Sequence, residues 1–262
     1  MAWSKRISGF LTRRKLGRLF GVDIFVSADI LFGLLIIGQA FWGIFSTVYH
    51  VPFIYLLIVI FGILVYVSVL IHELAHSLAA RRCGLFASKI TLWWMGGSAD
   101  IEDKEATPGK EFIFAFAGPL ANLVLAILLR LIAIPFYIWG WTVVADLAIF
   151  LFAINLILFV FNMLPVFPMD GGLCLVRTPL WWFLKSKVRA TRIAARLGQF
   201  LAIILAVISI LHVDLWLLVV ALFIVFFAEK ELRQVIVIEK IKKSQAEISE
   251  ELKNLEDGKE VK

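Results

Sequence analysis

Six long runs of apolar residues constrain the fold of this chain more than any other feature. They cover residues 28–46, 52–80, 112–137, 143–164, 197–212 and 215–228. A helix needs about 20 apolar residues to cross a bilayer. Hydrophobic residues make up 61% of the 262 residues, against about 45–50% in a soluble domain. We therefore expect an all-α polytopic membrane protein with about six transmembrane helices, of which the last two are short.

The positions of the basic residues predict the orientation of these helices. Of the 26 Lys and Arg, six precede the first run, five lie between the second and third, six between the fourth and fifth, and eight follow the sixth. Only Arg130 remains, near the far end of the third run, where its stem can snorkel. Cytoplasmic loops carry the excess of Lys and Arg. The pattern thus predicts a multi-pass protein of the cell membrane with both termini in the cytoplasm, and the net charge of +6 does not indicate nucleic-acid binding.

The remaining segments divide the chain further. Residues 85–101 are apolar, β-prone and interrupted by Gly96-Gly97, which favours a short membrane-associated β-hairpin over a hydrophobic loop. We expect a basic cytoplasmic segment at residues 1–20, a six-span core at 21–230 and a charged cytoplasmic tail at 231–262. Apolar residues recur in the tail at a spacing of 3–4, which favours an amphipathic helix and leaves a coiled coil as the alternative.

The strongest chemical signal is the sequence His72-Glu73-Leu74-Ala75-His76 near the end of the second run. Residues four apart lie on one helical face, so both imidazoles can bind one metal ion. Zinc with a neighbouring carboxylate as general base is typical of metalloproteases. Ionisable residues are costly inside a membrane unless they are paired or functional. The pattern therefore predicts a catalytic zinc site within the bilayer.

A catalytic zinc usually has three protein ligands and one open position. The charge pattern places His50 and His212 on the far side of the membrane, so neither can complete the site. Asp170 is the candidate, because prolines block a helix over residues 165–172 and Gly171-Gly172 permits unusual dihedral angles there. A turn or helix-capping aspartate is the alternative.

Three motifs in this order resemble the site-2 protease family of intramembrane zinc metalloproteases, over about residues 20–230. They are His72-Glu73-Leu74-Ala75-His76, Gly118-Pro119-Leu120-Ala121-Asn122, and Asn162 with the downstream Pro165 and Asp170-Gly171. The resemblance implies that His72, His76 and Asp170 bind one zinc ion per chain and that Glu73 is the catalytic base. It also implies that Asn162 orients the substrate or its oxyanion, and that Met95-Gly96-Gly97 belongs to a membrane-dipping hairpin. The chain resembles the minimal core, without PDZ or CBS modules.

We therefore expect an enzyme that hydrolyses peptide bonds within or near transmembrane segments, as in regulated intramembrane proteolysis. Its expected partners are single-span membrane proteins and the bilayer, with homo-oligomerisation left open. An edge strand of the hairpin would hold an unwound substrate by strand addition. The alternative is a non-proteolytic metal-binding scaffold or transporter, which would have no need for Glu73. A zinc peptidase with a helical Glu as third ligand fits less well, and a di-iron enzyme would need more histidines than the four present.

Overall fold

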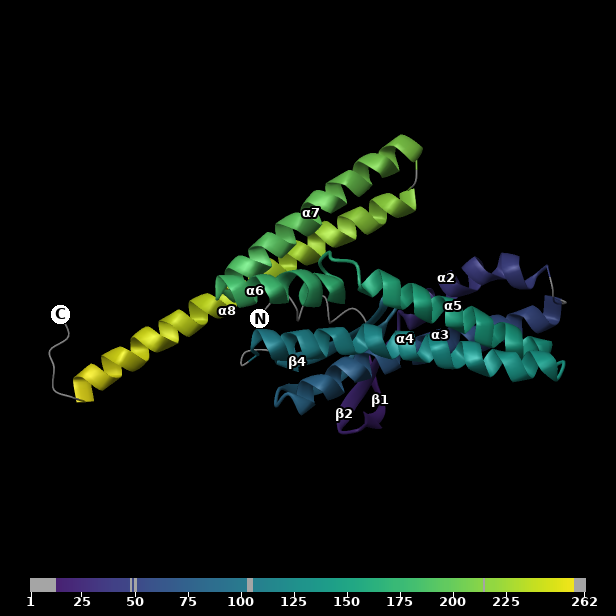
Figure 1. Cartoon of the computed structure of the whole chain (residues 1–262), viewed down its shortest axis with the longest axis horizontal. Helices are drawn as coiled ribbons and strands as arrows, with labels where there is room; N and C mark the ends of the chain where they lie inside the picture. The colour runs from purple at the N-terminus through teal and green to yellow at the C-terminus, as the bar shows by residue number, and fades with distance from the viewer. Residues whose placement is uncertain (1–12, 48, 50, 103–105, 214, 257–262) are drawn as a thin grey trace. The chain divides into compact units, whose positions relative to one another are not determined.

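The computed structural model describes residues 13–47, 49, 51–102, 106–213 and 215–256 (Figure 1). Along the chain the elements are β1 (Arg13–Leu19), β2 (Val22–Ser27), α2 (Ile30–Phe45), α3 (Val51–Arg82), β3 (Phe86–Trp93), β4 (Gly96–Glu102), α4 (Pro108–Ile138), α5 (Thr142–Asn162), the π-helix η1 (Gly172–Arg177), α6 (Thr178–Leu184), α7 (Lys187–His212) and α8 (Leu215–Glu256). They form two compact units, one ending at Met163 and one beginning at Leu164. Each unit is described by itself.

The six apolar runs correspond to α2, α3, α4, α5, α7 and α8. Among the described residues, α3, α4, α5 and α7 are long and apolar enough to cross a membrane. Helix α2 has 16 residues, which is short for a full crossing. Helix α8 has 42 residues and continues into the predicted tail. A mostly helical membrane protein is therefore confirmed, whereas six crossings remain a prediction.

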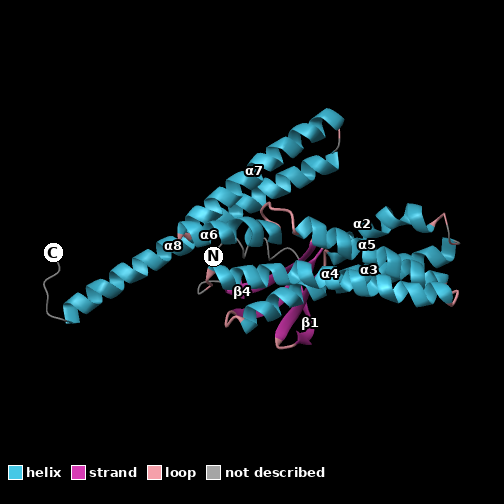
Figure 2. Cartoon of the chain, in the orientation of Figure 1, coloured by secondary structure: helices cyan, strands magenta, loops and turns pink. Residues whose placement is uncertain are grey.

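The sheet is larger than the sequence predicted, so the all-α class needs correction. The predicted hairpin is present as β3 and β4, but it belongs to a four-stranded sheet of order β1-β2-β3-β4. The strands are magenta in Figure 2. Strands β1 and β2 are antiparallel, β2 and β3 parallel, and β3 and β4 antiparallel. Residues 13–20 of the expected basic N-terminal segment thus contain a strand, while residues 1–12 lie outside the described part. Lys15 pairs with Asp23 at 2.7 Å across β1 and β2, and this hydrogen bond lowers the pKa of Asp23.

The sheet packs against α3, the helix that carries the His-Glu-x-x-His sequence. One core cluster joins Val22, Ile90 and Leu92 of the sheet to three residues of the helix (Val69, Leu70 and Leu74). The Tyr66 hydroxyl donates a hydrogen bond to the Trp94 carbonyl at 3.1 Å. At the helix end, the Arg81 guanidinium donates to the Phe20 carbonyl at 2.7 Å. These contacts hold the sheet over the second half of α3.

Helices α2, α3, α4 and α5 form the rest of the first unit. Ile54 and Phe61 of α3 pack with Leu151 of α5 in a fully apolar cluster. The outward residues of α4 are also apolar and exposed (Val124, Ile127, Leu128, Leu131 and Ile132). A helix that is apolar on its outer face as well as its inner face suits a lipid surrounding. Helix α4 begins cleanly, because the Thr107 side chain accepts a hydrogen bond from the Lys110 amide and Pro108 occupies its first turn.

The second unit contains η1, α6, α7 and α8, with α7 and α8 side by side (Figure 1). The prediction that residues 165–172 are not helical is partly wrong. The irregular backbone ends at Met169, and a helical segment begins at Asp170 and continues as η1. Phe167 lies 2% exposed in a core with four residues of α7 and α8 (Ala194, Ala195, Ala228 and Leu232). The irregular segment is therefore anchored by its own aromatic side chain.

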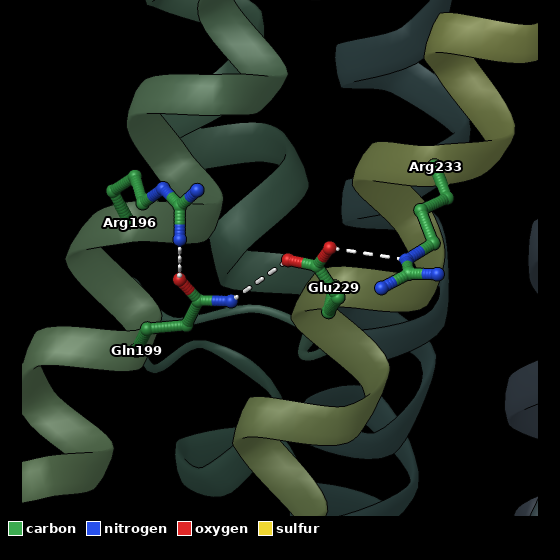
Figure 3. Close-up of polar contacts among 4 residues, drawn as sticks. All are labelled: Arg196, Gln199, Glu229 and Arg233. Carbon is green, nitrogen blue, oxygen red and sulfur yellow. Dashed lines mark hydrogen bonds and ion pairs between the residues drawn. The ribbon is translucent and has the colours of Figure 1, made fainter.

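Polar side chains also join α7 to α8 (Figure 3). The Gln199 amide donates to Glu229 at 3.2 Å, and the Arg233 guanidinium donates to the same carboxylate at 3.0 Å. Arg196 in turn donates to the Gln199 oxygen at 2.7 Å. The hydrogen bond from Arg233 is the largest cause that holds the pKa of Glu229 below its usual value. This cluster fixes the register of the two helices at one level.

Candidate metal and active site

His72 and His76 lie one helical turn apart on α3, and both side chains are buried. Their Nε2 atoms face each other at 3.0 Å. Glu73 follows His72 directly, so its carboxylate starts from a neighbouring position on the helix. Because both imidazoles point to one place, the structure brings these three predicted residues together as the sequence implied.

The hydrogen bonds of the other ring nitrogens fix the state of both imidazoles. His76 Nδ1 lies 2.6 Å from the Phe114 carbonyl, and His72 Nδ1 lies 2.5 Å from the Asn122 side-chain oxygen. Both oxygens can only accept, so each Nδ1 carries a hydrogen, and in the neutral imidazole Nε2 then has the lone pair. Facing lone pairs repel, and a cation between them removes the repulsion. Metal-binding histidines usually donate their other N–H in this way.

The spacing of the two nitrogen atoms also fits zinc. Imidazole nitrogen binds zinc at about 2.0–2.1 Å, so two such ligands of a tetrahedral ion lie roughly 3.3 Å apart. The 3.0 Å between the Nε2 atoms of His72 and His76 needs only a small adjustment to reach that value. Two buried imidazoles therefore offer two of the ligand atoms that a zinc ion would need.

Two glycines bring neighbouring elements into direct contact with the site. A Cβ atom on Gly97 of β4 would lie 2.5 Å from Cγ and 2.9 Å from Oε1 of Glu73. A Cβ atom on Gly118 of α4 would overlap His76 Nε2 and lie 2.5 Å from His76 Cε1. Both positions therefore require glycine, because any side chain would displace Glu73 or His76. Gly96 and Gly97 lie within β4, not in the turn, which is formed by Trp94 and Met95.

A row of buried polar side chains leads away from His72. Asn122 of α4 donates to the Asn155 oxygen of α5 at 2.9 Å, and Asn155 donates to the Ser68 hydroxyl of α3 at 3.0 Å. Asn155 and Ser68 were not among the site residues predicted from the sequence. Two signals could have identified them: an Asn within an apolar run is costly in a membrane, and Ser68 lies four residues before His72, on the same helical face.

Asn162 and Asp170 are the two predicted site residues outside α3. Asn162 is the last residue of α5 and half-buried. It lies seven residues after Asn155, and therefore on nearly the same helical face and about 10 Å further along the axis. Asp170 belongs to the second unit, where it is half-buried at the start of the helical segment.

The sequence-based reason given for the glycines after Asp170 was wrong. Gly171 has φ −61° and ψ −35°, which is ordinary helical backbone. Gly172 is needed for close approach instead, because a Cβ atom there would lie 2.7 Å from the Phe167 amide nitrogen. The start of η1 thus lies directly against the irregular segment that precedes it.

A family model described as Peptidase family M50 matches residues 60–146 and 137–205, which together are more than half of the chain. The chain belongs to peptidase family M50. The matched region contains the His pair, Glu73, Gly118, Asn122, Asn162 and Asp170. The resemblance to the site-2 protease family is therefore confirmed.

Relatives in this family extend the comparison. A zinc metalloprotease of Methanocaldococcus jannaschii is 37% identical over 204 residues, covering 71% of this chain and 57% of the relative. The Rip3 protein of Mycobacterium tuberculosis is 37% identical over 150 residues, covering 57% of this chain and 38% of Rip3. The chain thus spans about half the length of these curated relatives. Among solved structures, the site-2 protease from Methanocaldococcus jannaschii matches with a TM-score of 0.58 and 28% identity, over 84% of this chain and 95% of that chain.

Proposed function

We propose that this chain is an intramembrane zinc metalloprotease that hydrolyses peptide bonds within or near transmembrane segments of membrane proteins. The observation that carries the proposal is the pair of Nε2 atoms 3.0 Å apart on an apolar helix, with Glu73 beside them. A metalloprotease needs both parts, a metal-binding pair and an adjacent general base. Membership in peptidase family M50 and relatives named zinc metalloproteases support the same activity.

The site residues divide the reaction between them. Bound zinc supplies a Lewis acid that polarises the scissile carbonyl and activates water. Glu73 takes a proton from the attacking water and gives it to the leaving amine. Gly97 allows β4 to lie against Glu73, which limits the positions the carboxylate can take. Asn162, at the end of α5, is proposed to hold the substrate or to donate to the developing oxyanion.

Asp170 is proposed as the third zinc ligand. Its support is the family resemblance, the ligand number of catalytic zinc sites and the anchoring of its segment by Phe167. The alternative of a helix-capping aspartate is testable, because Asp170 stands at the start of a helix. Purified protein should contain about one zinc per chain, which His72→Ala and Asp170→Ala should lose and Glu73→Gln should keep. Undiminished zinc in Asp170→Ala, measured by elemental analysis, would exclude Asp170 as a ligand.

We propose that β4 holds the substrate. A helical substrate has its carbonyls hydrogen-bonded internally, so it must unwind before cleavage. Within the described sheet, β3 is interior, since Thr91 pairs with Phe25 of β2 and with Ser98 of β4. Strand β4 lies at the edge, and an unwound segment can add to it by backbone hydrogen bonds. Neighbouring strands lie about 4.8 Å apart, so a segment added to β4 would lie about that far from β4. Gly97 of β4 in turn contacts Glu73.

The activity is tested by co-expression with single-span membrane proteins. The wild-type chain should convert a substrate into fragments cut within its span, and Glu73→Gln should leave it intact while binding zinc. Cleavage that persists in Glu73→Gln, or zinc binding without cleavage of any of a broad panel of substrates, would favour the scaffold or transporter alternative.

Strand addition is tested with prolines along β4. Ser98→Pro and Ala99→Pro each remove one amide, and successive amides of a strand point to opposite sides. The proline that removes the outward amide should stop cleavage of a spanning substrate while zinc content is kept. Ser98→Ala is the side-chain control. Leu16→Pro is the matched control on the opposite edge, at an irregular position of β1. If all proline variants cleave like wild type, strand addition to β4 is wrong.

A further inference from the structure

His72 is the start of a hydrogen-bonded row that crosses three helices. The row runs from His72 on α3 to Asn122 on α4, to Asn155 on α5, and back to Ser68 on α3. Every member is buried, with exposures of 7% for His72, 1% for Asn122, 0% for Asn155 and 3% for Ser68. Burial of a polar side chain costs free energy unless the side chain is hydrogen-bonded. A member of the row that moved would lose these hydrogen bonds, so each side chain is held in place.

Two backbone carbonyls at the end of the row away from His72 set which group donates and which accepts in every hydrogen bond of the row. Asn155 donates from Nδ2 to the backbone carbonyl of Leu151 at 2.8 Å, and Ser68 donates to the carbonyl of Leu64 at 3.1 Å. These carbonyls cannot donate, so the Asn155 amide cannot flip without placing its oxygen against the Leu151 oxygen. Its Nδ2 group therefore faces Leu151 and Ser68, and its oxygen faces Asn122.

The same constraint passes to the metal site. Asn122 must present its NH₂ group to the Asn155 oxygen, so its own oxygen faces His72. An oxygen at that position requires a hydrogen on His72 Nδ1. The remaining ring nitrogen, Nε2, then presents its lone pair toward His76 Nε2. Two backbone carbonyls thus decide which nitrogen of His72 is available to a metal.

We propose that Ser68, Asn122 and Asn155 are positioning residues, which hold His72 as the Nδ1–H tautomer with Nε2 directed at the metal. The inference rests on the proposed role of His72 as a zinc ligand. In His76, the Phe114 backbone carbonyl accepts from Nδ1 in the same way. His76 is thus oriented by a backbone carbonyl, whereas His72 is oriented by side chains that come from three helices.

The test measures zinc affinity by competition with a chelator, on the full chain purified in detergent. Asn122→Leu and Asn155→Leu should weaken zinc binding, the first by roughly 10–100-fold, as expected when the partner of a metal-binding histidine is removed. Ser68→Ala is the smallest change and should weaken it by a few-fold. Ser77→Ala is its matched control, because Ser77 is also buried on α3 and also donates to the carbonyl four residues earlier, that of Glu73. It should bind zinc like wild type.

Two further measurements separate positioning from a general packing defect. Because Ser68 acts through Asn155, the double variant Asn155→Leu/Ser68→Ala should bind zinc no more weakly than Asn155→Leu alone. Only four histidines are present, so ¹⁵N-histidine NMR of metal-free protein can identify each ring. The His72 ring should be the Nδ1–H tautomer in wild type and a mixture of tautomers in Asn155→Leu.

The outcomes distinguish this inference from the proposed function. Zinc retained in His72→Ala would overturn the ligand assignment itself. Zinc lost in His72→Ala but bound normally by Asn155→Leu would overturn only the positioning role. The positioning role would also be overturned if the losses of zinc affinity in Asn155→Leu and Ser68→Ala multiplied in the double variant. Equal losses of zinc affinity in Ser68→Ala and Ser77→Ala would overturn it as well.

Discussion

Gly97 and Gly118 decide how closely two elements approach α3, the helix of the proposed metal site. Both lie where a single added carbon would occupy the space of a site residue, Glu73 in one case and His76 in the other. The two contacts affect different steps, because Glu73 is the proposed base and His76 a proposed ligand. Alanine at each glycine should therefore separate catalysis from metal binding.

Gly97→Ala should lower proteolysis while zinc content stays unchanged. The new methyl group would lie 2.5 Å from Glu73 Cγ, so the carboxylate must move. A displacement of about 1 Å in a catalytic group can cost roughly 100-fold in rate. Cleavage of a co-expressed substrate and elemental analysis of the purified protein measure the two effects. Loss of zinc together with activity would contradict the assignment of this contact to Glu73 alone.

Gly118→Ala should instead lose zinc. Its methyl group would occupy the position of His76 Nε2, the atom that presents a lone pair to the metal. Chelator competition should show weaker zinc binding, with proteolysis lost as a consequence. Gly109→Ala, also on α4, is the control, because no atom of the described residues lies within 4 Å of a Cβ atom there. Wild-type zinc affinity in Gly118→Ala would contradict the predicted overlap.

At the scale of elements, the π-helix η1 connects the Asp170 segment to α8. Arg177 at its end is 2% exposed and pairs with Glu231 of α8 at 2.7 Å. Its guanidinium also lies 5.6 Å from the centre of the Phe167 ring. Phe167 packs in turn against α7 and α8. Glu231, near the middle of α8, therefore supports the segment that contains Asp170.

Arg177→Ala should destabilise the protein far more than Arg233→Ala. Removing one member of a buried ion pair lowers the free energy of unfolding by about 3–5 kcal/mol. We expect about 3 kcal/mol here, because Glu231 is partly exposed. Arg233 is 77% exposed and pairs with Glu229 within one helix, so its removal should cost about 0.5 kcal/mol or less. Thermal unfolding in detergent measures both variants. Equal shifts in the unfolding midpoint would show that the Arg177 pair contributes no more than a surface pair.

At the scale of the whole molecule, the charge pattern gives an orientation that accessibility can test. On a background without cysteine (Cys83→Ser, Cys174→Ala), a membrane-impermeant thiol reagent should label Trp139→Cys on intact cells. Trp139 is 67% exposed at the end of α4, on the predicted far side. Arg189→Cys and Gln245→Cys, on the predicted cytoplasmic side, should be labelled only after the cells are opened. The reverse pattern would invert the orientation.

The helices were predictable because their signal is local. Each apolar run carries its own hydrophobicity, and the six runs match six helices within a few residues at most ends. The exceptions are α8, which continues past its apolar run to Glu256, and α7, which begins at Lys187, ten residues before its apolar run. Its first turns are charged, so hydrophobicity could not reveal them, although Ser186 caps the helix by accepting from the Arg189 amide.

Strands β1 and β2 could not be predicted in the same way. Strand β1 is mostly exposed and basic, so it lacks the alternation of a half-buried strand. Its place in a sheet depends on β2, which pairs in parallel with β3 more than 60 residues later. Parallel pairing is non-local, and no short stretch of sequence encodes it.

The residues of the proposed metal site and base could be identified from the amino-acid sequence. His72, Glu73 and His76 share a helix, so their spacing alone brings two imidazoles and a carboxylate together. How these residues are held depends on contacts between helices that the sequence does not reveal. The tautomer of His72 depends on Asn122 and Asn155, which come from two other helices. The physical reason is that hydrogen-bond direction is a property of the assembled contact, whereas ligand type and helical spacing are properties of the chain.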